Sequence, residues 1–347
     1  MIPGAGHTAS AEFPAMGTAV GVTAHAATAH GVTAAESLPQ ARALVEALEA
    51  IWSRFRPTSD VGRLNRAEGA PVAVDPRTDA LLRQAKRLAA LSGGAYDPTL
   101  GRLVQAWEQA APAPPEPSAL VAALATRGPD RLEPVGGVGR DGRDPDAPPR
   151  WRLTGDAQLD LGGLAKGQTA DAVRDLLRSN GAASALVTLG TSSVAVWGRH
   201  PGGRPWRVGL AAVGAAAGQV IGHLELIAGS LSTSSNALRA GGAGPGGPSR
   251  PAAALAARDV LNPDTGRPAD SGVGAVSVVA AAGAAAEAYS TAILVRGAEW
   301  ALDQYQALAC GPDAFEAVIQ DRDAVLVTPG LRGRFHPARP TQVNTSS

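Results

Sequence analysis

The chain has 347 residues, and its 31 Lys and Arg balance its 31 Asp and Glu, so its formal net charge is zero. This balance gives no case for nucleic acid or an anionic membrane as the main partner. The single cysteine, Cys310, excludes an internal disulfide and a cysteine-based metal cluster. The length allows one large domain or two smaller ones.

The first residues, 1–7, contain neither the basic stretch nor the apolar stretch of a secretory signal peptide. We therefore expect a cytoplasmic protein, provided that no export signal is missing from this sequence. The six histidines show no metal-ligand spacing along the sequence; they are His7, His25, His30, His200, His223 and His336.

Apolar periodicity and turn residues predict a mixture of helices and strands. In the first half they predict, in chain order, a strand at 16–24, a helix at 37–55, a short helix from a cap at 57–60 through Leu64, a helix at 78–91 and a loop-dominated excursion at 111–149. In the second half they predict a helix at 169–179, strands at 185–189, 206–210 and 220–227, a surface loop at 240–257, a strand at 273–280, a helix at 284–296 and short strands near Ala317 and Val325.

The elements do not alternate regularly between strand and helix, so we expect an α+β fold with a mixed β-sheet and packed helices. The weakly polar run at 275–295 contains Glu287 and predicts a core strand and a buried helix, with no membrane span. The expected domain spans residues 13–328, with loop-rich excursions at 111–149 and 240–257 and with tails at 1–12 and 329–347.

A glycine-rich segment at 159–167, Leu-Asp-Leu-Gly-Gly-Leu-Ala-Lys-Gly, leads into a predicted helix. Only Lys86 and Lys166 among the 31 basic residues are lysines. Glycines before a helix let backbone N–H groups approach an anion, and a compact ammonium can reach a phosphate. The alternative is a glycine turn into an amphipathic helix with a solvated lysine.

Glu287, Ser290 and Thr291 share one face of the predicted helix, because residues three and four apart are neighbours. A carboxylate and two hydroxyls offer hard oxygen ligands to Mg²⁺. The alternative is a buried glutamate whose charge is met by an arginine. A further turn, Tyr96-Asp97-Pro98-Thr99, presents polar side chains, but Asp and Thr are also ordinary helix caps.

Seven motifs occur in a specific order along residues 13–297. They are Ala-Met-Gly-Thr at 15–18, Ser-Arg-Phe-Arg-Pro at 53–57 with Ser59 and Asn65, Tyr-Asp-Pro-Thr at 96–99 with Trp107, the glycine-lysine segment at 160–167, Thr-Ser-Ser at 233–235, Asn-Pro-Asp-Thr-Gly-Arg-Pro at 262–268, and residues 286–291. This series resembles the ApbE family of FAD:protein FMN transferases.

The resemblance implies an α+β flavin-transferase fold that binds FAD and Mg²⁺ and transfers FMN from FAD to a Thr or Ser hydroxyl of an acceptor flavoprotein, releasing AMP. A metal ion bridging the pyrophosphate would offset charge on the leaving group. Carried over by motif, the FAD-binding residues would be Met16, Phe55, Ala95, Tyr96, Asp97, Asp160, Lys166 and Leu261. The metal ligands would be the Gly163 carbonyl, Glu287, Ser290 and Thr291.

The sequence departs from the family pattern at several positions. Asp259 stands where the resemblance implies the basic histidine, Asn262 and Glu287 each stand where it implies an aspartate, Gly190-Thr191-Ser192 replaces Gly-Gly-Asp, and Ser235 replaces a glycine. A carboxylate can act as the general base, so Asp259 is the expected catalytic residue. The alternative functions are a non-catalytic homologue that binds FAD or a partner, or an FAD pyrophosphatase without transfer.

Overall fold

The computed structural model describes residues 7–26, 33–111, 113–136, 148–213, 218–236, 260–309, 311–321, 324–338 and 343–344. The expected surface loop at 240–257 and the residues His30, Asp259 and Cys310 lie outside these ranges.

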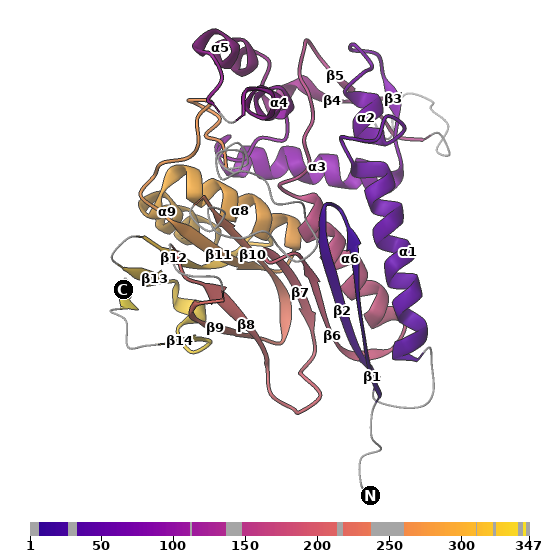
Figure 1. Ribbon diagram of the computed structural model, residues 1–347, viewed down its shortest axis with the longest axis vertical. Helices are drawn as coiled ribbons and strands as arrows, with labels where there is room; N and C mark the ends of the chain where they lie inside the picture. Colours follow the sequence, from indigo (N-terminus) through magenta and orange to yellow (C-terminus); the bar gives the residue numbers. More distant parts are fainter. Residues whose placement is uncertain are drawn as a thin grey trace, which may run out of the picture.

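A nine-stranded sheet forms the centre of the molecule (Figure 1). Its strands are, in spatial order, β1 (His7–Ala15), β2 (Thr18–Ala26), β6 (Ala182–Leu189), β7 (Ser193–Trp197), β10 (Ala228–Ser235), β11 (Ala275–Ala280), β12 (Phe315–Gln320), β13 (Val325–Val327) and β15 (Val343–Asn344). Neighbouring strands are antiparallel except β13 and β15, which are parallel. The sheet is therefore mixed, as the sequence predicts.

Helices and a small sheet cover this central sheet. Helices α1 (Ala34–Trp52), α6 (Ala165–Ser179) and α8 (Gly283–Arg296) pack on its strands (Figure 1). A three-stranded sheet, β14 (Phe335–Pro337), β9 (Val220–Leu226) and β8 (Trp206–Ala211), shares a separate apolar core with alternate residues of β7 and with β10 to β13. Because strand side chains alternate between faces, this core and the core beneath the helices lie on opposite sides of the sheet.

A second layer of short elements lies beyond the helices, at the top of Figure 1. It contains α2 (Asp60–Leu64), α3 (Pro76–Leu91), α4 (Gly101–Ala110), α5 (Pro117–Ala125) and the sheet β3 (Val72–Ala73), β5 (Arg150–Leu153) and β4 (Leu132–Val135). The described part of the chain also contains helix α9 (Ala298–Leu308) and the 3₁₀ turns η1 (Pro129–Arg131) and η3 (Pro329–Leu331).

Helices α6 and α8 approach each other at a glycine pair. A Cβ atom on Gly167 would lie 2.5 Å from the Gly283 carbonyl oxygen and 2.7 Å from Cγ of Glu287. Asp171 of α6 also accepts a 2.6 Å hydrogen bond from the Gly283 N–H, which supplies a cap that the N-cap residue of α8, Ala282, does not provide. The predicted helix at 284–296 thus crosses α6 close to the glycine-lysine segment.

The predicted elements at α1, α2, α3, α6 and α8 are present, as are strands β2, β6, β8, β9, β11, β12 and β13. The excursion at 111–149 is more ordered than expected, because it contains α5, η1 and β4. Strand β1 begins at His7 and β14 lies at 335–337, so parts of both expected tails pair with neighbouring strands. The domain span of 13–328 stays a proposal.

Strand β10 was not expected from the sequence. Its residues, Ala-Gly-Ser-Leu-Ser-Thr-Ser-Ser, carry little apolar periodicity. It is nevertheless a central strand between β7 and β11, and Ser230 and Ser232 are almost fully buried. Its hydroxyls are satisfied by partners on α6, α8 and β11, for which no local sequence signal exists.

Candidate functional site

The start of α6 meets the turn between β6 and β7. Lys166, the second residue of α6, donates a 2.9 Å hydrogen bond from Nζ to Oγ of Ser192. The same turn is fixed to the β1–β2 hairpin, since the Gly190 N–H donates to the Ala19 carbonyl at 2.7 Å. A side chain on Gly190 would collide with Thr18, and the backbone there has a positive φ of 62°.

A chain of hydroxyl groups continues from Lys166 toward α8. Oγ of Ser192 lies 3.3 Å from Oγ of Ser193, and Ser193 donates to Oε1 of Glu287. Two serines therefore connect the predicted phosphate-binding lysine to the predicted metal-binding carboxylate. We call Lys166 and Glu287, joined through the hydroxyls of Ser192 and Ser193, the hydroxyl-bridged pair.

Both charged ends of this pair are uncompensated in the described part of the chain. Glu287 is only 5% exposed, yet neither it nor Lys166 forms an ion pair with any described residue. The expected alternative of a buried glutamate neutralised by an arginine is therefore not what the described residues show. A buried carboxylate without a cationic partner costs free energy unless a ligand supplies the charge.

Ser290 and Thr291 differ in their surroundings. Ser290 is fully buried, donates to the Glu287 carbonyl at 3.0 Å, and lies 3.2 and 2.8 Å from the hydroxyls of Ser232 and Ser234. Ser290 thus fastens α8 to β10. Thr291 lies one helical turn beyond Glu287 and is partly exposed, so its hydroxyl is accessible on the same face.

The glycine turn before α6 is shaped by Asp160. Its Oδ1 accepts a 2.7 Å hydrogen bond from the Gly162 N–H, and its own N–H donates to the Pro98 carbonyl at 2.8 Å. Among the described residues no backbone N–H donates to the Gly163 carbonyl, which leaves that oxygen free for a ligand. The Asn65 side-chain amide holds the adjacent Leu159 backbone by two hydrogen bonds: its Nδ2 donates to the Leu159 carbonyl at 3.0 Å, and its Oδ1 accepts from the Leu159 N–H at 2.7 Å.

Tyr96 packs against this turn. A Cβ atom on Gly163 would lie 3.4 Å from the Tyr96 ring, so the glycine admits the ring at van der Waals distance. Burial raises the pKa of Tyr96 well above its usual value, helped by the nearby carboxylates of Asp97, Asp160 and Glu287. The phenol is therefore neutral, and its buried hydroxyl has no hydrogen-bond partner among the described residues.

The residues beside Tyr96 complete this wall. Ala95 is buried against Ala292 and Val295 of α8. Asp97 is 5% exposed, and burial raises the pKa of its carboxyl despite two hydrogen bonds that Oδ1 accepts from Thr99. Its Oδ2 has no partner in the described part of the chain. An orphaned buried oxygen is a feature that functional sites retain.

Arg54 and Phe55 lie at the rim of the glycine turn. Arg54 contacts Asp160 at 3.2 Å and Glu108 of α4 at 2.6 Å, and its guanidinium lies 4.1 Å from the centre of the Phe55 ring. The Phe55 side chain is 74% exposed. An exposed aromatic ring backed by a guanidinium offers a stacking surface for a planar ligand.

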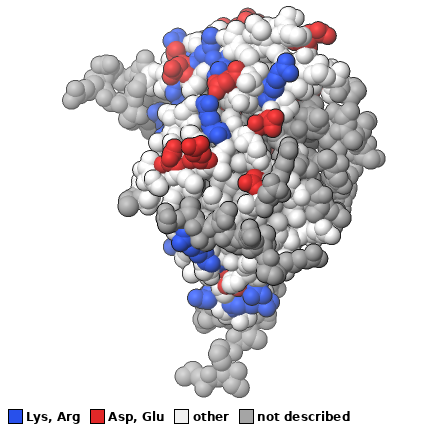
Figure 2. Space-filling model, turned by 90° about the vertical axis from the view of Figure 1, so that its left-hand side faces the viewer, with Lys and Arg blue, Asp and Glu red and all other residues white. Residues whose placement is uncertain are grey.

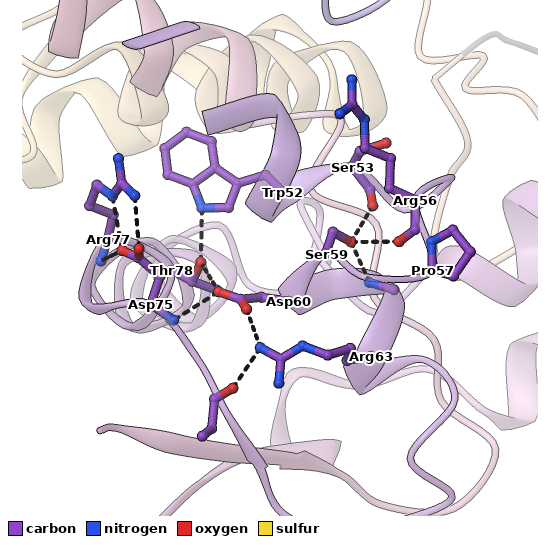
Figure 3. A network of polar contacts seen from close by, with 12 residues as sticks. Trp52, Ser53, Arg56, Pro57, Ser59, Asp60, Arg63, Asp75, Arg77 and Thr78 are labelled. Carbon is purple, nitrogen blue, oxygen red and sulfur yellow. Dashed lines mark hydrogen bonds and ion pairs between the residues drawn. The ribbon is translucent and has the colours of Figure 1, made fainter. Parts of the chain in front are cut away.

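A buried polar network supports this rim (Figure 3). The Ser59 hydroxyl donates to the carbonyls of Ser53 and Arg56, at 2.6 and 2.9 Å. It also accepts a hydrogen bond from the Gly62 N–H in the first turn of α2. The Asp60 carboxylate accepts hydrogen bonds from the Thr78 hydroxyl and the Asp75 N–H and forms an ion pair with Arg63. The Trp52 indole N–H donates to the Thr78 hydroxyl. The loop at 53–57 is therefore held at both ends.

Met16 and Leu261 lie in different surroundings. Met16 has a left-handed φ of 53° in the two-residue turn between β1 and β2, a strained conformation for a non-glycine residue. Leu261 packs against Leu103 and Trp107 of α4, and the Trp107 N–H donates to the Gly266 carbonyl at 2.8 Å. Ser235, at the end of β10, donates to the Gly274 carbonyl.

The turn that follows Leu261 is also well defined. Oδ1 of Asn262 accepts the Asp264 N–H at 2.8 Å, and Asp264 pairs with Arg127 and Arg296. Asn262 therefore acts as a turn residue here, a role that an aspartate shares. Asp259 lies outside the described residues, so its position relative to the site stays a prediction.

Sequence reasoning missed several contributors. Arg54 and Ser193 contact the predicted site residues Asp160 and Glu287, and Asn65 holds Leu159 beside Asp160, but only their place inside or beside a motif singled them out. His223, Glu225 and His336 have no metal-ligand spacing along the chain, yet the fold places ligand atoms of all three within 4.8 Å of one another. Strand pairing of β9 with β14 brings them together.

A pocket of about 490 Å³ lies elsewhere. It is lined by Arg178 of α6, Tyr305 of α9 and Trp197, the last residue of β7, whereas Ser193 is the first. The pocket and the hydroxyl-bridged pair are thus at opposite ends of the strands. Figure 2 shows acidic and basic side chains interspersed over the upper part of one face. No described helix is both long and apolar enough to span a membrane.

Comparison with known proteins identifies the family. The model of the ApbE family matches residues 16–314. An FAD:protein FMN transferase of Rhodobacter capsulatus is 31% identical over 292 residues, which cover 82% of this chain and 50% of that protein. One from Treponema pallidum is 39% identical over 158 residues, covering 44% of this chain and 42% of that protein. The chain thus spans about half the length of these two relatives.

Solved structures show the same fold. The flavin transferase ApbE from Vibrio cholerae superimposes with a TM-score of 0.74 at 22% identity, covering 91% of this chain and 94% of that one. The apo flavinyl transferase ApbE of Pseudomonas stutzeri gives 0.72 at 25% identity, covering 91% and 92%. The family match over most of the sequence and this shared architecture agree, and the chain belongs to the ApbE family.

Proposed function

We propose that the protein is an Mg²⁺-dependent FAD:protein FMN transferase. A Thr or Ser hydroxyl of an acceptor protein would attack the phosphorus on the flavin side of the FAD pyrophosphate. A phosphoester bond to FMN forms, the pyrophosphate P–O bond breaks, AMP leaves, and the hydroxyl proton passes to a base. The names of the relatives support this reaction class.

One observation carries the proposal, namely the uncompensated charges of the hydroxyl-bridged pair. Lys166 presents a cation at the start of α6, where the helix dipole adds positive potential. Glu287 presents a buried anion two hydroxyls away. A pyrophosphate with its metal ion is a ligand that satisfies both charges at once, since the phosphate oxygens need a cation and the metal ion needs an anion.

The residues at Glu287 fit a magnesium ion by their chemistry. The glutamate carboxylate, the Thr291 hydroxyl and the Gly163 carbonyl are hard oxygen donors, and the last accepts no described backbone hydrogen bond. Ser290 would be the fourth donor, although its present contacts fasten α8 to β10. When bound, Mg²⁺ would neutralise charge that develops on the pyrophosphate.

The other residues would orient the substrate. Phe55, backed by Arg54, would stack on one ring system of FAD, and Tyr96 with Ala95 and Asp97 would form another wall of the site. Met16 and Leu261 would add apolar contacts. Asp259 would take the proton of the acceptor hydroxyl, because it stands where the resemblance implies the basic histidine.

The test is AMP release from FAD by the purified protein with Mg²⁺, with and without a candidate acceptor, together with in-gel fluorescence of covalently bound flavin. We expect AMP and flavinylated acceptor in equal amounts, and neither in excess chelator. AMP without flavinylation would instead identify a pyrophosphatase, and FAD binding without AMP would identify a non-catalytic homologue. Either result would contradict the transferase proposal.

A further inference from the structure

Two histidines and a glutamate converge on the small sheet of β8, β9 and β14. His223 and Glu225 are two residues apart on β9 and therefore share one face. His336 of β14 is the direct antiparallel partner of His223. The two rings stack with centroids 4.9 Å apart, and one ligand atom from each of the three residues lies within 4.8 Å of the others.

One nitrogen of each histidine ring lacks a hydrogen-bond partner among the described residues. Nε2 of His223 and Nε2 of His336 are buried atoms, and neither has a hydrogen-bond partner in the described part of the chain. The closest carboxylate contact is 3.5 Å, from Nε2 of His336 to Oε2 of Glu225. Buried polar atoms are normally satisfied, so two orphaned nitrogens beside a carboxylate indicate a place for a ligand.

The charges around the site leave the donors available. Arg207 of β8 occupies Oε1 of Glu225 at 3.1 Å, while Arg334 donates to the Glu225 backbone carbonyl. Oε2 of Glu225 therefore faces His336.

We propose that His223, Glu225 and His336 bind one divalent transition-metal ion of the zinc class, with water completing the coordination. Two imidazoles and a carboxylate are an established ligand set for zinc, whereas Mg²⁺ prefers oxygen donors alone. The bound ion would tie β14 to β9 and so fasten the chain after β13 to the small sheet. This site is independent of the one that would serve FAD.

The test uses the full chain without an affinity tag, freed of metal and titrated with Zn²⁺ by calorimetry. We expect a site of one equivalent that weakens at least about tenfold in His223→Gln and in His336→Gln, since even indirect partners of a metal matter by that factor. His25→Gln, a histidine on β2 outside the cluster, is the matched control and should bind Zn²⁺ like the parent.

Thermal unfolding provides a second readout. Zn²⁺ should raise the Tm of the parent and of His25→Gln, because a ligand that binds only the folded state stabilises it, and should leave both cluster variants unchanged. Circular dichroism establishes whether the variants are folded. If His223→Gln does not fold, His336→Gln serves as the test variant. Excess Mg²⁺ should not displace the Zn²⁺. Equal Zn²⁺ affinity in parent and cluster variants, or no Zn²⁺ binding by the parent, would overturn the proposal.

Discussion

The contact between α6 and α8 can be tested by adding one methyl group, in Gly167→Ala. The new Cβ would lie 2.5 Å from the Gly283 carbonyl oxygen, 2.6 Å from its carbon and 2.7 Å from Cγ of Glu287. Real Cβ contacts essentially never fall below 3.0 Å, so the helices must separate by at least about 0.5 Å. Because two of the three atoms are backbone, no rotamer change relieves the clash.

The expected magnitude follows from two opposing effects. Overpacking in a core costs about 1–3 kcal/mol, and backbone contacts place this variant at the upper end. Alanine regains up to about 1 kcal/mol of helix propensity over glycine in α6. The net loss is about 2 kcal/mol, which corresponds to a fall in Tm of about 3 °C for a chain of this size.

The same displacement separates Glu287 from the hydroxyl chain. We therefore expect the rate of FAD cleavage to fall by more than the loss of stability alone would explain. The assay is thermal unfolding together with Mg²⁺-dependent AMP release, with Gly333→Ala as the control. Gly333 has open space around its Cβ position and no positive φ. A Gly167→Ala protein with the Tm and AMP release of the parent would refute the view that this glycine contact sets the site.

Four further predictions concern individual side chains. Lys166→Ala should weaken FAD binding about ten- to a hundredfold by flavin-fluorescence titration, since a charge-assisted hydrogen bond is lost, and the parent should bind FAD more tightly than FMN; equal millimolar affinities for both would contradict the assignment. Glu287→Gln should remove most Mg²⁺-dependent AMP release while the exposed Glu299→Gln does not, and full activity in excess chelator would contradict a metal site. Asp259→Asn should abolish transfer but leave FAD affinity nearly intact, and Asp259→His should match or exceed the parent rate near neutral pH; transfer by Asp259→Asn at the parent rate would exclude it as the base. Burial raises the pKa of Asp97 above 3.8, so its folded state binds more protons than the unfolded state, and the contribution of this carboxyl to stability falls as pH rises through the window above 3.8. The Tm should therefore decline less with rising pH in Asp97→Asn than in the parent. Parallel curves of Tm against pH would contradict this.

The sequence predicted much of the helical framework. The cap predicted for α2 is present at Ser59, whereas the predicted helices at 37–55 and 78–91 start three and two residues inside α1 and α3, whose caps are the Thr33–Glu36 capping box and Asp75 followed by proline. These signals are local, because a cap and its helix are neighbours along the chain. The same holds for Glu287 and Thr291, whose spacing alone puts them on one face of α8.

Strands were predicted less completely, for a reason visible in β10. Its buried residues Ser230 and Ser232 lack the apolar alternation that marks a strand, and their partners lie 59 and 58 positions away. The loop at 111–149 shows the same difficulty, since β4 is a short strand whose one partner among the described strands is β5. Short strands gain stability from partners that the local sequence does not identify.

The sequence by itself determined the family, the glycine-lysine entry to α6 and the helical spacing of the proposed metal ligands. Only the tertiary structure decided that Ser192 and Ser193 connect Lys166 to Glu287, since these contacts bridge 26 and 94 positions. It also decided that His336 meets His223, through the register of β9 and β14. Helix periodicity acts over four residues and is written locally, whereas sheet register and helix crossing depend on how the whole core packs.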